Sequence, residues 1–273
     1  AGEMQGDAIF RAIGDNHRGH AHQIARGFKA RTGDGWRINT DLRALGQTPL
    51  HLPNGQMILS RRVLGVPVLM LPRAMPTDDL AAQLSDTGLQ RLPLILSPEQ
   101  SWHSCGAIRL HRPQSTAQVD LRAPEAQRRA ALHPKWRNQL RKAEAGPLKV
   151  SQTLMPADPD HPVLRLDAAQ AQVRRYAHWP APLTAAFAKA APDQTHLFIA
   201  SLGPQPVAHM LFLSHGGRAS YHIGHTTTRG KAECAHNLLL WRAFCDLARI
   251  GIETVDLGLL NPRTAGLNRF KLR

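Results

Sequence analysis

The fold is decided by Ala219-Ser-Tyr-His-Ile-Gly224 and by two later segments, Ala235-His-Asn-Leu-Leu-Leu-Trp-Arg-Ala-Phe244 and Thr254-Val-Asp-Leu257. The first and third segments have the composition of short strands. Between them, apolar residues recur every three or four positions, which predicts an amphipathic helix from about Ala235 to Ile250, with Gly251 just past its end. A strand, a helix and a strand with tight connections form a crossover unit, so we expect an α/β or α+β fold with a mixed sheet.

Further elements are predicted upstream of this unit. Turn signals at Gly203-Pro204 and Gly216-Gly217 indicate a hairpin followed by a third antiparallel strand. Helix signals follow Pro124 and Pro134, and Gly146-Pro147 ends the second helix. In chain order, the expected elements before the crossover are a helix at 22–30, strands at 57–59 and 66–71, a helix at 78–87, strands at 91–96 and 117–121, helices at 125–132 and 134–145, and strands at 197–200 and 207–213.

The chain is strongly basic, with 34 Lys and Arg against 20 Asp and Glu and a formal net charge of +14. This balance predicts an acidic partner: nucleic acid, an anionic membrane or a phosphorylated substrate. Aromatic residues make up only 5%, which disfavours a protein that stacks bases on rows of rings. Part of the charge is concentrated between Leu121 and Val150, where two acidic residues accompany eight basic ones: Arg122, Arg128, Arg129, Lys135, Arg137, Arg141, Lys142 and Lys149.

Several classes of protein are excluded or disfavoured. The three cysteines are widely spaced, which excludes a disulfide framework and a Cys-rich zinc site. The longest apolar stretch, Val63 to Leu71, contains Pro67 and is far shorter than the roughly 20 residues that span a bilayer. With no signal pattern at the start, a cytoplasmic location is expected. The usual dinucleotide, P-loop, zincin and serine hydrolase motifs are also missing.

An ordered set of motifs resembles the FemAB-type branch of the GNAT acyltransferase superfamily. The set covers roughly residues 117–273 and consists of Val119-Asp-Leu121, Lys135-Trp-Arg-Asn-Gln-Leu-Arg-Lys-Ala-Glu144, Tyr221-His-Ile-Gly224, Leu239-Leu-Trp241, Gly251, Asp256-Leu-Gly258 and Gly266-Leu-Asn-Arg-Phe-Lys271. The resemblance implies a GNAT fold with a mixed, partly antiparallel sheet. It also implies two GNAT-like halves in tandem, residues 1–123 and 124–273, that face each other across a cleft.

The resemblance also implies a reaction, in which an activated acyl or aminoacyl group passes to a primary amine. The family's Phe-Lys pair matches Phe270 and Lys271. A lysine near the reacting ester would stabilise the oxyanion, and one well-placed donor there contributes on the order of 3 kcal/mol. The alternative is that Lys271 is an ordinary surface lysine. We further expect Asn237 to contact the donor and Tyr221 to contact the substrate.

The segment from Thr226 to Ala235 is predicted to be a polar loop before a helix N-terminus, where amide groups can bind phosphate. Coenzyme A-dependent relatives carry a (Gln/Arg)-x-x-Gly-x-(Gly/Ala) pattern here, whereas Arg229 is followed by Ala232 and Cys234 at the two glycine positions. The degraded pattern puts coenzyme A binding in doubt. The prediction is that Arg229, Gly230 and Lys231 meet a donor phosphate, that no cofactor is tightly bound, and that the donor is aminoacyl-tRNA or acyl-CoA, with tRNA slightly favoured.

The basic helix offers a second place for an anion. Arg137 and Arg141 lie one turn apart and could clamp the phosphates of a donor or acceptor, although a solvated charged face is an equally good interpretation. Trp136 and Leu140 fit a core stripe better than ligand contacts.

An attacking amine must lose a proton to a base. The candidate bases are His209, His222 and His225, and His225 is the one predicted to be catalytic. His209 and His222 are expected to face one another across the sheet, but a structural role fits each histidine as well. Asp256 could orient an amine or shape a turn.

Two other clusters of reactive residues are interpreted as having no metal-binding or catalytic role. His17, His20 and His22 have the right residue type for a metal but no acidic or Cys partner at ligand spacing, so no metal is expected. Cys105 and His103 are too close in sequence to favour a nucleophilic dyad, and Cys105 is interpreted as a small buried residue.

The leading hypothesis is therefore an amide-forming N-acyltransferase with an amine acceptor. Two rivals stay open: a non-catalytic nucleic-acid-binding protein on a GNAT scaffold, and an acyltransferase that touches an anionic membrane peripherally and makes an aminolipid.

Overall fold

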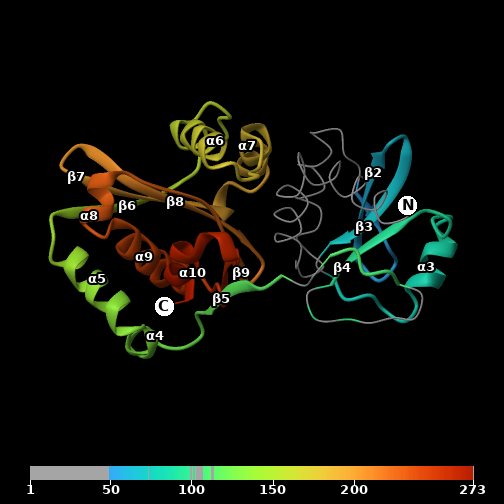
Figure 1. Cartoon of the computed structure of the whole chain (residues 1–273), viewed down its shortest axis with the longest axis horizontal. Coiled ribbons are helices and arrows are strands. Elements are labelled where there is room, and N and C mark those ends of the chain that lie inside the picture. Colours follow the sequence, from blue (N-terminus) through green and yellow to red (C-terminus); the bar gives the residue numbers. More distant parts are fainter. Residues whose placement is uncertain are drawn as a thin grey trace.

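The computed structural model describes residues 49–72, 74–98, 100, 102, 107–111 and 114–272. These residues form two β-sheets with their own helices (Figure 1). The predicted helix at 22–30 lies outside the described residues.

The N-terminal sheet has four strands in the order β1-β2-β3-β4. The first three strands pair antiparallel and β4 is parallel to β3, so this sheet is mixed. Leucine and isoleucine side chains of its strands and of helix α3 form a separate small core. The bounds are β1 (Leu50–His51), β2 (Met57–Val63), β3 (Val66–Pro72), α3 (Leu80–Asp86) and β4 (Leu94–Ser97).

The C-terminal sheet has six strands in the order β5-β10-β9-β8-β7-β6. Its strands are β5 (Thr116–Asp120), β6 (Leu148–Leu154), β7 (Thr195–Leu202), β8 (Gln205–His215), β9 (Arg218–Thr226) and β10 (Thr254–Leu259). Its helices are α4 (Glu125–Ala131), α5 (Pro134–Glu144), α6 (Pro162–Arg174), α7 (Ala181–Ala190), α8 (Thr228–Ala232), α9 (Ala235–Arg249) and α10 (Ala265–Leu272).

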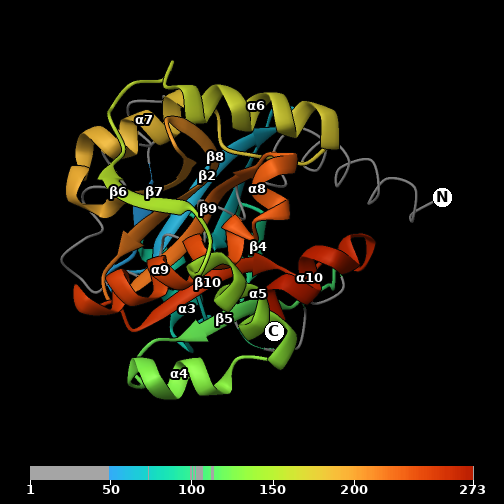
Figure 2. The same ribbon diagram turned by 90° about the vertical axis from the view of Figure 1, so that its left-hand side faces the viewer.

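Strand β8 shows why helices cover both faces of this sheet. Its side chains alternate between the two faces, and both sets are buried: Met210 and Phe212 join the cluster with α9, whereas Leu211 and Leu213 join the cluster with α6 and α7. Figure 2 shows α6 and α7 on the opposite side of the sheet from α4 and α5. The α6–α7 cluster also takes in Met57 of β2, so the two sheets share apolar contacts.

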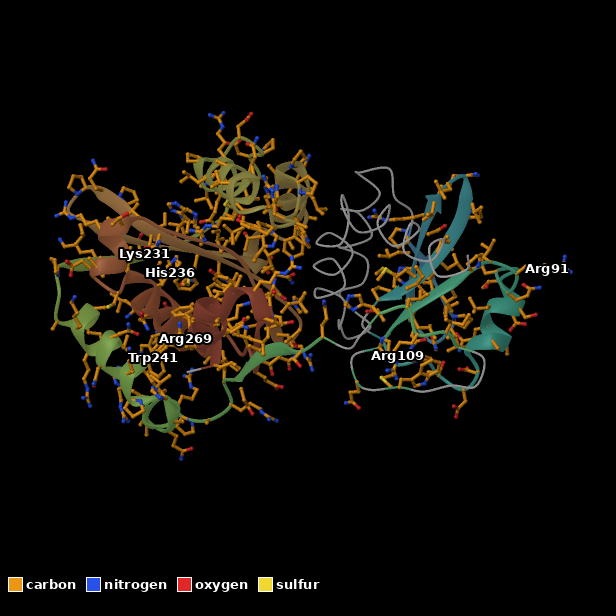
Figure 3. The ribbon with its side chains drawn as sticks, in the orientation of Figure 1. Arg91, Arg109, Lys231, His236, Trp241 and Arg269 are labelled. Carbon is orange, nitrogen blue, oxygen red and sulfur yellow. The ribbon has the colours of Figure 1, made fainter. Side chains whose placement is uncertain are left out.

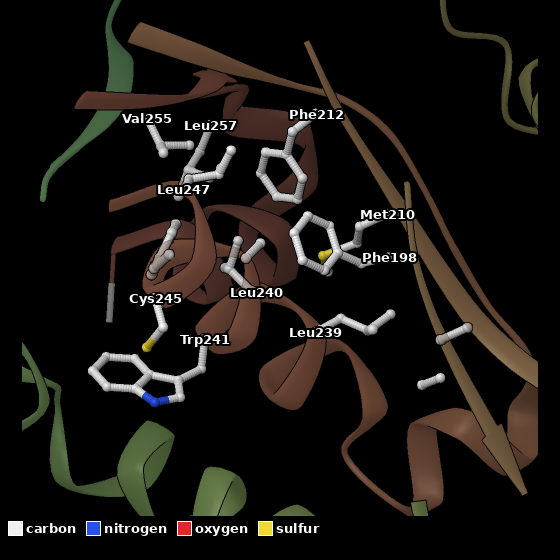
Figure 4. Packing of buried hydrophobic residues seen from close by; sticks show 14 of the residues in the cluster. Phe198, Met210, Phe212, Leu239, Leu240, Trp241, Cys245, Leu247, Val255 and Leu257 are labelled. Carbon is white, nitrogen blue, oxygen red and sulfur yellow. The ribbon is translucent and has the colours of Figure 1, made fainter. Parts of the chain in front are cut away.

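The larger core lies between α9 and the sheet (Figure 4). The predicted stripe on α9 is confirmed, because Leu240, Phe244 and Leu247 are buried there. The α5 stripe is also confirmed, since Trp136 and Leu140 are buried in the same core.

The crossover unit is confirmed as well. Strands β9 and β10 pair in parallel and α9 connects them, while β7, β8 and β9 pair antiparallel in sequence. Gly251 has a φ of 85° directly after the helix, a conformation that favours glycine.

Three features differ from the sequence-based expectations. Elements β6, α6, α7 and α10 were not predicted. The expected loop from Thr226 to Glu233 contains the short helix α8, which Thr227 caps by accepting a hydrogen bond from the Gly230 amide (3.0 Å). Strand β5 precedes the expected boundary at residue 123 yet pairs with β10 in the C-terminal sheet.

Candidate active site

The parallel strands β9 and β10 pair at three positions and then separate. Thr254, Val255 and Asp256 lie opposite Arg218, Ala219 and Ser220. Beyond this point β10 continues along β5 after a register shift, and β9 continues along β8. We call the two diverging segments, residues 221–226 and 257–260, the β9–β10 fork.

Backbone carbonyl groups of the β9 arm accept side-chain donors. The Gly224 carbonyl accepts from Gln170 Nε2 (3.1 Å) and the His225 carbonyl from His236 Nε2 (2.9 Å). Residues of α6 and α9 therefore contact the β9 arm of the fork from separate elements.

The Phe-Lys pair lies at the β10 arm. Lys271 Nζ donates to the Leu259 carbonyl at the end of β10 (2.9 Å), and the side chain is half-buried. The Phe270 ring lies near the rings of Trp136 and His236, with centroids 6.3 and 6.1 Å apart. Helix α10 thus brings Lys271 to the end of β10 and Phe270 to the start of α9.

Asp256 is buried at the point where the fork begins. Its carboxylate accepts a hydrogen bond from the Gly258 amide (2.6 Å), across the register shift in β10. This contact is consistent with a turn-shaping role for Asp256, while its role in orienting an amine stays a prediction.

The predicted pairing of His209 with His222 is wrong. His209 lies opposite His225 in the β8–β9 ladder, and their rings stack with centroids 5.3 Å apart. A bulge places His222 out of register, and its Nε2 lies 3.0 Å from Thr184 Oγ1, beside the Trp179 ring.

Burial makes the charged form of both stacked histidines less favourable. Burial, with smaller effects from neighbouring histidines, lowers the pKa of His209 from 6.5 to about 4. Burial also lowers the pKa of His225, and the charges of Arg174 and Lys231 act in the same direction.

His236 was missed by sequence reasoning. It lies in the first turn of α9, close to Lys231 (Figure 3), and burial is the main cause that lowers its pKa. His236 could have been found from the sequence, because it directly follows the segment from Thr226 to Ala235 that was predicted to bind the donor.

The α8 segment uses its amide groups internally. The amides of Gly230 and Lys231 donate to Thr227, that of Glu233 to Arg229 and that of Cys234 to Lys231. Gly230 is buried, and a Cβ atom there would lie 2.5 Å from the Val207 carbonyl oxygen. Close packing against the Val207 carbonyl group therefore favours glycine at position 230.

The remaining predicted donor contacts are placed as follows. Arg229 and Lys231 are exposed on α8. Asn237 is buried in the first turn of α9, and its Nδ2 has no hydrogen-bond partner in the described part of the chain.

Tyr221 begins the β9 arm and packs its ring on Phe212. Its hydroxyl lies 1.6 Å from where a Cβ atom of residue 224 would be, so the ring lies over Gly224. Burial, and then the charge of Asp167, raises the pKa of Tyr221.

Much of the basic charge near α5 has internal partners. Arg129 forms an ion pair with Glu144, and Lys142 Nζ donates to the Ala232 carbonyl of α8 (2.7 Å). Arg137 Nη1 donates to the Ala130 carbonyl (3.2 Å), whereas Arg141 is exposed. A phosphate clamp by Arg137 and Arg141 stays a prediction.

The described residues contain neither a candidate membrane span nor a candidate metal site. No described helix combines the length and the apolar character that a bilayer crossing requires. Within the same residues, no cluster of three or more His, Cys, Asp or Glu side chains is arranged to hold a metal ion. His17, His20, His22, His103 and Cys105 lie outside the described residues.

A mixed sheet with one parallel pair that diverges beside a crossover helix is the architecture of the GNAT-fold class. The chain belongs to the GNAT acetyltransferase family, because residues 127–272 match the family described as "Acetyltransferase (GNAT) domain". No curated protein matches the chain.

Solved structures extend this likeness beyond the family region. The crystal structure of FemX matches with a TM-score of 0.68 and 11% identity over 92% of this chain and 90% of that one. The structure of L-PGS from Bacillus licheniformis matches with a TM-score of 0.53 and 12% identity, over 95% and 77% of the two chains. The structure of a conserved protein of unknown function from Bacteroides thetaiotaomicron matches with a TM-score of 0.57 and 12% identity, over 98% of this chain and 92% of that one. The fold is that of the FemAB-type branch.

Proposed function

We propose that this protein forms an amide by moving an acyl or aminoacyl group from an activated donor to a primary amine, at the β9–β10 fork. The observation that carries the proposal is the position of Lys271, whose ammonium group is held at the end of β10 by the Leu259 carbonyl. A fixed positive charge at the opening between two strands suits a reaction in which negative charge develops on a carbonyl oxygen.

The reaction needs no covalent enzyme intermediate. The amine nitrogen attacks the donor carbonyl carbon, and the tetrahedral oxyanion that forms is stabilised by Lys271. The bond from carbon to the donor oxygen or sulfur then breaks, an amide remains, and the amine proton leaves through a base to the departing group. Positioning of the two substrates supplies much of the rate.

We infer that the donor is aminoacyl-tRNA and not acyl-CoA. Pyrophosphate binding at a GNAT loop uses amide groups, and those of Gly230, Lys231, Glu233 and Cys234 donate within the segment instead. The side chains of Arg229 and Lys231 are exposed and suit a phosphate of a larger donor. The net charge of +14 favours a polyanionic donor in the same way.

Arg137 and Arg141 complete the proposal as contacts to an anionic substrate. Lys142 ties their helix to α8 through the Ala232 carbonyl, so both basic segments lie next to one another. Asn237 and Phe270 border the donor beside His236, and Tyr221 borders the acceptor.

The test is a transfer assay with the full chain. A radiolabelled pool of aminoacyl-tRNA and labelled acetyl-CoA are supplied separately with a panel of primary amines that includes amino sugars, peptides and aminolipid precursors in vesicles. We expect label in an amide product from aminoacyl-tRNA. Label from acetyl-CoA alone would overturn the donor assignment, and tRNA binding with no product from any donor would favour a non-catalytic nucleic-acid-binding protein.

A further inference from the structure

A buried carboxylate in α6 binds a histidine in the α6–α7 connection. Asp167 Oδ2 lies 3.3 Å from His178 Nδ1, and Asp167 Oδ1 accepts a hydrogen bond from the Tyr176 hydroxyl (2.7 Å). The Asp167 side chain is 8% exposed and that of His178 is 29% exposed. The carboxylate is therefore inside the protein, and the imidazole reaches the surface.

The cluster of Asp167, Tyr176 and His178 is connected to the β9 arm of the fork by hydrogen bonds of Gln170. Gln170 Nε2 donates both to the Tyr176 hydroxyl oxygen (3.0 Å) and to the Gly224 carbonyl (3.1 Å). Trp179 follows His178 in the chain, and its ring contacts the ring of His222, with centroids 4.6 Å apart. Residues 176–179 thus run beside the β9 arm.

The bond to Asp167 decides which nitrogen of His178 can accept a proton. A carboxylate holds the Nδ1 proton, so the neutral ring has its lone pair on Nε2, at the far side of the ring from Asp167. A buried carboxylate that orients an imidazole in this way is the usual support of a general base.

The other histidines near the fork have different surroundings. Burial lowers the pKa of His209, His225 and His236. The His222 Nε2 atom is engaged with Thr184. The surroundings of these four histidines therefore differ from those of His178 beside Asp167.

We propose that Asp167 and His178 form the dyad that deprotonates the acceptor amine. His178 Nε2 takes a proton as the amine nitrogen bonds to the donor carbonyl carbon, and the resulting imidazolium gives that proton to the leaving oxygen of the donor. Asp167 is the positioning residue, because it holds the ring and stabilises the imidazolium. The inference rests on the proposed amide-forming function and adds the base that the function requires.

Charged and titratable groups near the dyad include Arg174 at the end of α6, Tyr176 just after it and Tyr221 on β9. Asp167 has its pKa raised by burial, while the bonds from Tyr176 and His178 act in the opposite direction. A pH profile of the wild-type enzyme therefore has to be compared with that of variants in which only His178 is changed.

The experiment uses the transfer assay with aminoacyl-tRNA and the amine that the wild-type protein accepts best. His178→Gln is expected to lower kcat by about 10²–10⁴-fold, to remove the acid limb of the kcat/KM profile, and to leave Tm within a few degrees of wild type. Imidazole is expected to restore part of the activity of His178→Gly. Asp167→Asn should lower kcat with little change in KM.

Two further variants separate catalysis from structure. His133→Gln makes the same chemical change at an exposed histidine that caps α5, and is expected to keep wild-type kcat. Tyr176→Phe removes a hydrogen bond of the network but keeps the dyad, so its acid limb should persist.

Three outcomes overturn the dyad. The first is an unchanged acid limb in His178→Gln, and the second is no effect of imidazole on His178→Gly. The third is an equal loss of Tm and kcat in His178→Gln, Asp167→Asn and Tyr176→Phe, which would mean a purely structural network. If the wild-type protein makes no amide from any donor, the proposed function itself fails, which is a distinguishable result.

Discussion

At the scale of single residues, the site depends on how individual groups are held. Lys271 is held by the Leu259 carbonyl, and Phe270 lies near the rings of Trp136 and His236. A cation that is already in place does not have to be reorganised when charge develops, which is why such groups stabilise transition states well. None of the residues of α10 is fully buried, although Phe270 packs against the larger core.

Lys271→Met is expected to lower kcat about 100-fold while Tm stays within a few degrees, because it removes an oxyanion donor and no core packing. The assay is steady-state transfer with melting measured in parallel. Arg269→Ala, an exposed cation two residues away in the same helix, serves as the control and should keep wild-type kcat. Equal turnover in Lys271→Met and wild type would remove the role of Lys271.

Gly230→Ala is expected to destabilise the protein by about 1–3 kcal/mol, since overpacking of a tight contact has this magnitude. The new Cβ atom would lie 2.5 Å from the Val207 carbonyl oxygen and 2.6 Å from Thr226 Oγ1. Gly266→Ala is the matched control, because nothing lies within 4 Å of its Cβ position. Denaturant unfolding measures both, and a Gly230→Ala variant as stable as Gly266→Ala would contradict the packing.

At the scale of elements, the crossover unit was predictable because its periodicities are strong. Helix α9 buries a continuous apolar stripe, and Ala219 of β9 with Val255 and Leu257 of β10 packs in the same core. Strand β6 was missed because it is an edge strand whose residues are mostly exposed, and helix α6 because apolar residues such as Leu166 and Val173 are exposed and blur its stripe. The cap histidines of α5 and α6 gave no recognised start signal.

The site was predictable only where it lies on those strong elements. Phe270 and Lys271 were found through the family resemblance, and the start of α9 through its position after a strand. Asp167 and Gln170 were missed because they lie on α6, and the Gln170–Gly224 bond joins residues 54 positions apart. A local pattern did exist, since Tyr176, His178 and Trp179 cluster between two helices, but only the fold shows that they flank β9.

The buried His209 of strand β8 is expected to make the free energy of unfolding depend on pH. The unfolded-state pKa of His209 is near 6.5 and the folded-state value is about 4, so the unfolded chain binds a proton first as pH falls. Stability should therefore decrease as pH falls from about 6.5 to about 4, by up to about 3 kcal/mol for this group. Urea unfolding at several pH values measures this decrease, and His209→Gln should make it smaller; an identical decrease in the variant would contradict the assignment.

At the scale of the whole molecule, the basic charge has two different uses. Part of it is internal, as in the Arg129–Glu144 pair and the Lys142–Ala232 bond. The exposed part includes Arg141 on α5 and also Arg229 and Lys231 on α8, the helix that directly follows the β9 arm. The match to FemX covers 92% of this chain, so both sheets belong to the same overall fold.

The central claim is that acyl transfer takes place in the β9–β10 fork, and a co-crystal structure tests it most directly. The ligand is an aminoacyl adenosine in which a stable amide replaces the reactive ester. We predict that its carbonyl group lies between residues 221–226 and 257–260, within hydrogen-bond distance of Lys271 Nζ, with His178 on the side from which an amine would approach. A ligand bound elsewhere, with the fork closed by protein side chains, would contradict the account.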